Sequence, residues 1–169
     1  MVLPVLQAPD ERLRKRSQEI DQKIIASPDM QQFFDNMIAT MHADDGIGIA
    51  APQIGKQLRA FSVGIEALKR FKVYTGSLPV DQELVLINPV WEKTTKKTLW
   101  DTEGCLSVPN TYGKVKRFGS IRVSALKRDG EKIEFEAKGY FARVIQHETD
   151  HLDGILFIDK AVDIVSSKP

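Results

Sequence analysis

The pattern His147-Glu148-Thr149-Asp150-His151 constrains this chain more than any other feature of its sequence. Residues four apart lie on one face of an α-helix, so a helix here would point both imidazoles toward a single metal ion. The intervening Glu148 can act on water bound to that metal. Two surface histidines on a charged helix are the alternative, but two of the chain's three histidines fall in this motif. The pattern therefore predicts a helix that carries part of a metal site.

The third metal ligand must come from elsewhere, because a catalytic metal usually has three protein ligands. A histidine six residues after the second is one known solution, but Phe157 occupies that position, and no glutamate follows Glu148. Cys105, the only cysteine, is the strongest upstream candidate, since a metal would hold it as a thiolate. The alternative is a small buried hydrophobic side chain. His42 is the rival ligand, although it is expected at the surface, at the end of a helix. Three downstream aspartates match no recognised ligand spacing: Asp153, Asp159 and Asp163.

Residues 46–55 form a glycine-rich segment. It lacks the lysine and hydroxyl residue of a phosphate-binding loop and the Gly-x-Gly-x-x-Gly spacing, so nucleotide binding is disfavoured. Small residues allow another backbone to come close, as a peptide-like substrate would. Gln53 offers an amide donor for an oxyanion, with an ordinary loop amide as an equal alternative.

An N-terminal amphipathic helix is expected after Ser27, which supplies a cap residue, with Pro28 in the first turn and Asp29 beside the helix N-terminus. A core-facing stripe follows at helical spacing: Met30, Phe33, Phe34, Met37, Ile38 and Met41. Residues 44–46 end this helix. The charged residues 10–23 before it are expected to be solvated.

Three later stretches favour β-strands: residues 58–65, 83–90 and 121–137. The third contains Asp129-Gly130 and predicts a hairpin. Residues 66–82 are expected to form a surface loop. A helix is expected over residues 140–153, with Gly154 as its stop. Strands followed by a helix predict an α+β fold with antiparallel sheet.

The composition limits the class of protein. A chain of 169 residues, 42% hydrophobic and 28% charged, fits a single globular domain over residues 1–169. The net charge of +1 argues against a dedicated nucleic-acid binder. One cysteine forms no internal disulfide, which points to a reducing compartment. No apolar run approaches the roughly 20 residues of a membrane span, and no secretory signal is apparent, so a cytoplasmic location is expected.

Three segments together resemble the signature motifs of the peptide deformylase family. Gly-x-Gly-x-Ala-Ala-x-Gln matches residues 46–53, Glu-Gly-Cys-x-Ser matches residues 103–107, and Gln-His-Glu-x-Asp-His matches residues 146–151. The resemblance extends from about residue 3 to residue 160. It implies a compact α+β fold, in which antiparallel sheets surround a C-terminal metal-binding helix. It also implies a hydrolase that removes the N-formyl group from the N-terminal methionine of new proteins and releases formate.

The resemblance also implies roles for individual residues. Cys105, His147 and His151 would be the metal ligands and Glu148 the general acid and base. Gln53 and the backbone N–H of Leu106 would hold the oxyanion. Six residues would bind the substrate: Ile47, Gly48, Gly104, Tyr140, Arg143 and Val144. Arg143 stands where some relatives have an aliphatic residue, and its stem can still pack.

The implied cofactor is one divalent metal ion, typically Fe²⁺, with Zn²⁺, Ni²⁺ or Co²⁺ as substitutes. One cysteine and two histidines suit zinc equally well, so the ligands leave the metal open. The implied partners are N-formylmethionyl nascent peptides and, transiently, the ribosome, without a membrane or recognition of a nucleic-acid sequence. The implied compartment is the bacterial cytoplasm, or an organelle after removal of a transit peptide.

Two other functions compete with deformylation. The His-Glu-x-x-His motif alone would also suit a different metallohydrolase such as an endopeptidase, although the missing downstream ligand counts against it. A catalytically silent metal- or peptide-binding module is the second, although every expected catalytic position is filled.

Overall fold

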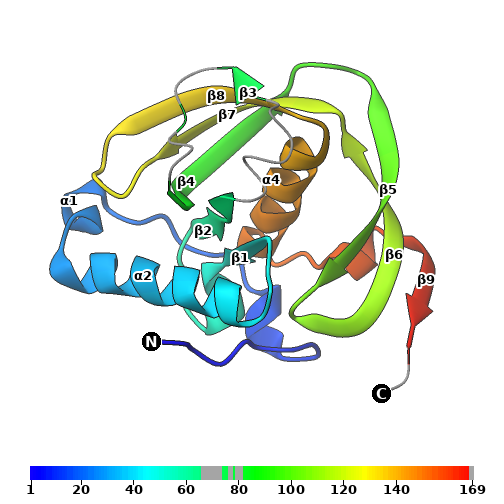
Figure 1. Cartoon of the computed structure of the whole chain (residues 1–169), viewed down its shortest axis with the longest axis horizontal. Coiled ribbons are helices and arrows are strands. Elements are labelled where there is room, and N and C mark those ends of the chain that lie inside the picture. Colours follow the sequence, from blue (N-terminus) through cyan, green and yellow to red (C-terminus); the bar gives the residue numbers. More distant parts are fainter. Residues whose placement is uncertain (66–73, 76–77, 79–81, 168–169) are drawn as a thin grey trace.

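Two antiparallel sheets surround one central helix (Figure 1). The computed structural model describes residues 1–65, 74–75, 78 and 82–167. The larger sheet has the strand order β1-β2-β4-β7-β8-β3 and the smaller sheet β5-β6-β9. The strands are β1 Gly48–Ala50, β2 Ala60–Val63, β3 Tyr74–Thr75, β4 Leu84–Lys93, β5 Thr98–Cys105, β6 Val108–Phe118, β7 Ser120–Leu126, β8 Lys132–Lys138 and β9 Val162–Ser166. The helices are η1 Glu11–Arg14, α1 Gln22–Ile25, α2 Pro28–Ala43, η2 Ala51–Ile54, α4 Gly139–Leu152 and η3 Phe157–Asp159. The α+β class is confirmed.

Helix α2 begins and ends as its sequence predicts. The Ser27 side chain accepts a hydrogen bond from the N–H of Met30, and Pro28 occupies the first turn. The helix ends at Ala43, with Asp44 as the C-terminal cap. Its buried side chains include Phe34, which packs in one hydrophobic cluster with residues of β1, β2 and β4.

Helix α4 packs against the larger sheet, and this contact forms the main core. Phe141 and Ile145 of the helix lie in one cluster with Val63, Val123 and Phe135 of the strands. Both ends of the helix lie within one residue of their expected positions. Gly154 follows with a φ of 75°, the left-handed conformation that ends many helices and favours glycine.

The predicted hairpin around Asp129-Gly130 is confirmed as β7 and β8, and Gly130 has a positive φ of 82°. The strands expected at 58–65 and 83–90 correspond to β2 and to β4, which runs on to Lys93. Of the loop expected over 66–82, the structure describes only 74–75, 78 and 82, and the rest lies outside the described residues. Residues 74–75 form the short strand β3.

Other features also differ from the sequence-based expectation, among them the short strands β1 and β9. The charged stretch 10–23 is not wholly solvated, because Leu13, Ser17 and Ile20 are buried. The long hairpin of β5 and β6 was not expected either. Its inward face carries the charged residues Glu103 and Arg117 beside the apolar Val115, so the alternating hydrophobic signal of a strand is interrupted. In the described part of the chain, no helix is both long and apolar enough to cross a membrane.

Candidate metal centre

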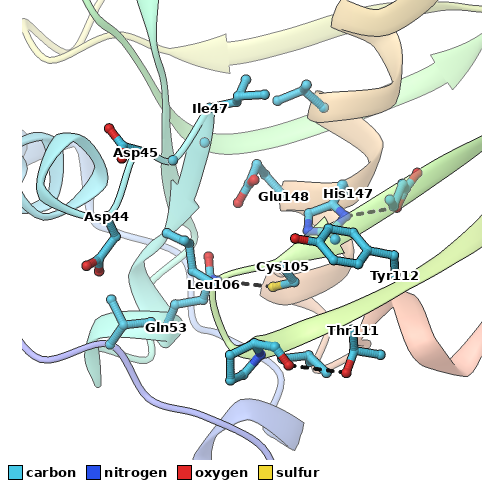
Figure 2. A pocket seen from close by; sticks show the side chains of 18 of the residues that line it. Asp44, Asp45, Ile47, Gln53, Cys105, Leu106, Thr111, Tyr112, His147 and Glu148 are labelled. Atoms are coloured by element: carbon cyan, nitrogen blue, oxygen red, sulfur yellow. Dashed lines mark hydrogen bonds and ion pairs between the residues drawn. The ribbon is translucent and has the colours of Figure 1, made fainter. Parts of the chain in front are cut away.

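The three expected metal ligands lie together between the smaller sheet and the central helix, and Figure 2 shows two of them, Cys105 and His147. Cys105 is the last residue of β5, while His147 and His151 occupy successive turns of α4. One ligand atom from each residue lies within 4.8 Å of the others. The Cys105 Sγ is 3.2 Å from the His151 Nε2. This spacing is close to the roughly 3.5 Å between a sulfur and a nitrogen bound tetrahedrally to one ion.

The electrostatics of the cluster also fit a divalent cation. Burial alone would raise the pKa of the Cys105 thiol, but the imidazoles of His151 and His147 hold it well below its usual range. Burial alone would lower the pKa of His147, but hydrogen bonds to Cys105 and Glu103 raise it to about 10. The site therefore stabilises an anionic sulfur beside a positive charge, as a cation site must.

Glu103 fixes the orientation of one ligand. Its carboxylate lies 2.9 Å from the Nδ1 of His147, which leaves the Nε2 of that ring for a metal. It also accepts two hydrogen bonds of 2.9 Å from Arg117 and one of 2.7 Å from Arg143. Burial alone would raise the pKa of Glu103, but the hydrogen bonds with His147 and Arg117 hold it well below its usual range. Glu103 therefore stays ionised, as an acceptor for the His147 N–H.

The residues around Glu103 form a buried ionic network that links three elements. Arg117 of β6 also donates to Asp150 of α4, and Lys160 pairs with the same aspartate at 2.7 Å. Sequence reasoning quoted Glu103 and Asp150 as motif positions without assigning them a role, and it missed Arg117 entirely. Glu103 and Asp150 could be noticed because they belong to recognisable motifs, whereas nothing in the local sequence distinguishes Arg117 from other charged residues.

Glu148 is buried beside the ligand cluster. Its residue is 4% exposed, and its Oε2 has no hydrogen-bond partner among the described residues. Its Oε1 lies only 2.5 Å from the position that a Cβ would take on Gly48, so a side chain at position 48 would displace this carboxylate. Burial raises the pKa of Glu148 to about 7, against the lowering effect of His147 and His151. A carboxylate with this pKa can both take and give a proton near neutral pH.

Gln53 is held with its amide N–H toward the cluster. Its Oε1 accepts a 2.8 Å hydrogen bond from the N–H of Ala50. Its Nε2 lies 3.0 Å from the Ser107 Oγ and 3.4 Å from the Cys105 Sγ. Two partners therefore fix the side-chain amide, and the donor end lies beside the ligand sulfur. Leu106, whose N–H was the other expected oxyanion donor, follows Cys105 in the turn between β5 and β6.

One cavity of about 630 Å³ opens onto this cluster. Its lining includes all six residues expected to bind substrate: Ile47, Gly48, Gly104, Tyr140, Arg143 and Val144. Cys105, His147 and Glu148 also line it. Their assembly around one cavity agrees with the expectation, while the role of each residue remains a prediction. The guanidinium of Arg143 points away into the ionic network, where it also donates to the carbonyls of Val115 and Leu99.

The rival ligands lie in other ion pairs. His42, at the end of α2, is 2.8 Å from Glu83, and its side chain is more than half exposed. The three downstream aspartates pair with arginine or lysine: Asp153 with Arg59, Asp159 with Arg14 and Asp163 with Lys114. Among the described residues, the metal-ligand cluster comprises Cys105, His147 and His151.

Comparisons with known proteins agree with this geometry. A model of the family described as polypeptide deformylase matches residues 2–167. The peptide deformylase of Thermodesulfovibrio yellowstonii is 42% identical over 162 residues, which cover 94% of this chain and 88% of that protein. The peptide deformylase of Wolinella succinogenes is 40% identical over 159 residues, with the same two coverages.

A solved structure shows the same fold. It is a class I type b peptide deformylase from Acinetobacter baumannii with Met-Ala-Ser bound. It is 32% identical, covers 95% of this chain and 98% of its own, and has a TM-score of 0.83. The match in sequence motifs, fold and ligand cluster extends over nearly the whole chain, which therefore belongs to the peptide deformylase family.

Proposed function

We propose that this site catalyses the reaction of the family and that the residues described above perform it. Peptide deformylases remove the N-formyl group from nascent chains, and this chain is a metal-dependent hydrolase of that family. The observation that carries the residue assignment is the meeting of Cys105, His147 and His151 with a buried Glu148 at one cavity. The three ligands leave a fourth position for water or substrate, as catalytic metal sites do.

The proposed metal is a single divalent ion, Fe²⁺ in the cell, with Zn²⁺, Ni²⁺ or Co²⁺ able to replace it. Cys105, His147 and His151 would hold it, and Glu103 would orient His147. When bound, such an ion lowers the pKa of water toward about 7 and polarises a carbonyl oxygen. The preference for iron is taken from the family, because thiolate and imidazole ligands suit several of these ions.

Glu148 is the proposed general acid and base. Its pKa of about 7 lets it take a proton from the attacking water at neutral pH and later deliver that proton to the leaving amine. The space around it supports this role, because the glycine at position 48 leaves its carboxylate open to the cavity.

Gln53 and the N–H of Leu106 are the proposed oxyanion donors. The tetrahedral intermediate of formamide hydrolysis carries negative charge on the former carbonyl oxygen, and each donor aimed at it is worth about 3–4 kcal/mol. The contacts with Ala50 and Ser107 hold the Gln53 amide in place before substrate arrives, so no energy is lost in orienting it.

Two strand edges that have no partner strand among the described residues would hold the substrate backbone. β1 is the edge strand of the larger sheet and β5 that of the smaller sheet, and both contribute residues to the cavity. A peptide can add to such an edge through backbone hydrogen bonds. The proposed contacts are Ile47 and Gly48 on one side and Gly104 on the other. The Acinetobacter baumannii relative with Met-Ala-Ser bound supports a peptide in this cavity.

The methionine side chain would enter the apolar part of the cavity, against Ile47, Tyr140 and Val144. The stem of Arg143 would complete this wall, because its charged end is directed into the ionic network. Partners beyond the formylated nascent chain are proposed as well. Transient contact with the ribosome would suit an enzyme of nascent chains, and the bacterial cytoplasm or an organelle would supply them.

The test is formate release from formyl-Met-Ala-Ser by protein purified without oxygen, with metal content measured on the same sample. We expect rapid release by the wild type. Glu148→Gln should bind the metal but lose at least about 100-fold in kcat, the low end of what general acid–base catalysis supplies. Glu92→Gln, in an exposed ion pair with Arg122, is the control. Near-normal turnover by Glu148→Gln would contradict the mechanism.

A further inference from the structure

The smaller sheet exposes a strip of aromatic and apolar side chains on its outer face. Strand register pairs Trp100 with Lys116, Gly104 with Tyr112 and Tyr112 with Val165. Directly opposite residues project from the same face of a sheet, so these side chains share one surface. Trp100 is 52% exposed, Tyr112 54% and Val165 66%. The pair Thr102 and Lys114 lies between Trp100 and Tyr112 in this register, so the strip alternates exposed aromatic rings with polar side chains.

This strip is continuous with the catalytic cavity. Tyr112 packs over Gly104, where an added Cβ would lie 2.8 Å from its ring, and both residues line the cavity (Figure 2). A second hollow lies farther along the same strands. Its lining is Trp100, Asp101, Thr102, Lys114, Val162 and Asp163. Thr102 borders both the cavity and this hollow, so a peptide that leaves the cavity along these strands meets the hollow next.

We propose that this strip binds the part of the substrate polypeptide that follows its first few residues, with a preference for apolar or aromatic side chains. The inference rests on the proposed function, because it takes the cavity as the site of the N-terminal methionine. The substrate is a long chain that must leave the cavity, and the free edge of β5 leads from Gly104 to Trp100. Continuity with the cavity favours this occupant over a second copy of the protein.

Strand geometry predicts the length of peptide that the strip needs. Gly104 and Trp100 are four strand positions apart, or about 13 Å at the usual rise of a strand. A peptide running along this edge must continue about four residues past the one opposite Gly104 to reach Trp100. A tripeptide therefore cannot contact the indole, whereas an octapeptide can. The Lys116 ammonium lies 5.9 Å from the centroid of the Trp100 ring, and Trp100 is 52% exposed beside it.

The experiment compares kcat/KM for formyl-Met-Ala-Ser and for formylated octapeptides that begin with the same three residues. One octapeptide continues with serine only, and three carry phenylalanine at position five, six or seven. We expect at least one phenylalanine peptide to exceed the serine peptide about fivefold, through a lower KM at similar kcat. Trp100→Ser should remove this gain and leave turnover of the tripeptide unchanged. Val165→Ser should reduce it, and Val90→Ser, exposed on β4, should retain it.

Equal kcat/KM for all four octapeptides in the wild type would overturn the proposal. So would a gain that survives Trp100→Ser, or a change in self-association of Trp100→Ser without a change toward peptides, which would make the strip a contact between copies. A failure of the proposed function is distinct, because the wild type would then not release formate from the tripeptide. Calorimetric binding of the same octapeptides without the formyl group tests the strip independently of turnover.

Discussion

At the scale of single residues, Gly48 and Glu148 share a space that has no room for a side chain on residue 48. A Cβ there would lie 2.5 Å from one carboxylate oxygen and 2.9 Å from the carboxyl carbon. Gly48→Ala should therefore displace Glu148 and lower kcat about 100-fold, as small misplacements of catalytic groups do, while metal content stays unchanged. Gly64→Ala is the matched control, because its nearest atoms lie at an ordinary 3.5 Å. Equal activity of the two variants would contradict the assigned role of Glu148.

For Arg143, the family resemblance predicted the position of the residue but not the direction of its side chain. The resemblance placed Arg143 at the substrate pocket, and Arg143 does line the cavity. Its guanidinium, however, donates hydrogen bonds to Glu103 and to the carbonyls of Leu99 and Val115. These contacts join α4 to β5 and β6. The direction of a long side chain depends on partners distant in sequence, which no local pattern reveals.

Arg143→Met should test this second role. The change keeps the apolar stem but leaves the Glu103 carboxylate with one fewer buried cation and two carbonyls without donors. We expect a loss of about 3 kcal/mol in the free energy of unfolding, measured with urea at fixed zinc content. Competition with a chelator should show roughly tenfold weaker metal binding, because His147 is less firmly oriented. Arg122→Met, which removes an exposed ion pair with Glu92, should change stability by less than about 1 kcal/mol.

At the scale of the element, a glycine at each end of α4 allows the cost of backbone strain to be distinguished from the cost of close packing. Gly139 and Gly154 both have positive φ, 55° and 75°. A Cβ on Gly139 would meet no atom within 4 Å, whereas one on Gly154 would lie 2.4 Å from the carbonyl oxygen of Arg14. Helix α4 therefore ends against the N-terminal segment, and its last turn includes the ligand His151.

Alanine at these two glycines should cost different amounts of stability. Gly139→Ala should cost about 1 kcal/mol, the strain of a left-handed residue with a side chain. Gly154→Ala should cost that amount plus about 1–3 kcal/mol for the clash with Arg14, and it should weaken metal binding through His151. Thermal unfolding of the two variants beside the wild type measures the difference. Equal losses would mean that the N-terminal segment does not pack tightly against the helix.

At the scale of the whole molecule, the candidate metal site joins the two sheets of the fold. Cys105 belongs to the smaller sheet, whereas His147 and His151 belong to the helix packed on the larger sheet. A bound ion would therefore cross-link the sheets in the folded state only. Its removal is expected to destabilise the entire domain as well as to stop catalysis.

Chelation provides the measurement. For free metal at about 100 times its Kd, binding adds about 2.7 kcal/mol to stability, which corresponds to roughly 5–10 °C in Tm for a chain of this size. We expect that loss on removal of the metal, and recovery of both Tm and formate release when Zn²⁺ or Fe²⁺ is returned. An unchanged Tm would argue that the ligands do not hold the ion together. Cys105→Ser should show a smaller response to added metal.

The sequence by itself determined the features whose cause is local. Capping by Ser27, the periodic apolar stripe of α2, the turn at Asp129-Gly130 and the spacing of His147 and His151 each act within a few residues, so helices α2 and α4 and the β7–β8 hairpin could be predicted. The resemblance to the family motifs then predicted Cys105 as the third ligand, which spacing alone had left open against other candidates, and the structure places it beside His147 and His151.

Only the tertiary structure decided what depends on distant partners. The strands β5 and β6 carry charged residues inward, and they are stable there because Glu103 and Asp150 pair with Arg117 and Arg143 across three elements. A hydrophobic pattern cannot reveal such strands, because the burial of a charge is favourable only when its partner is already in place. The same assembly brings the free edge of β5 to the cavity and leaves Trp100 exposed beside it, an arrangement that follows from the packing of the two sheets and from no single segment of the chain.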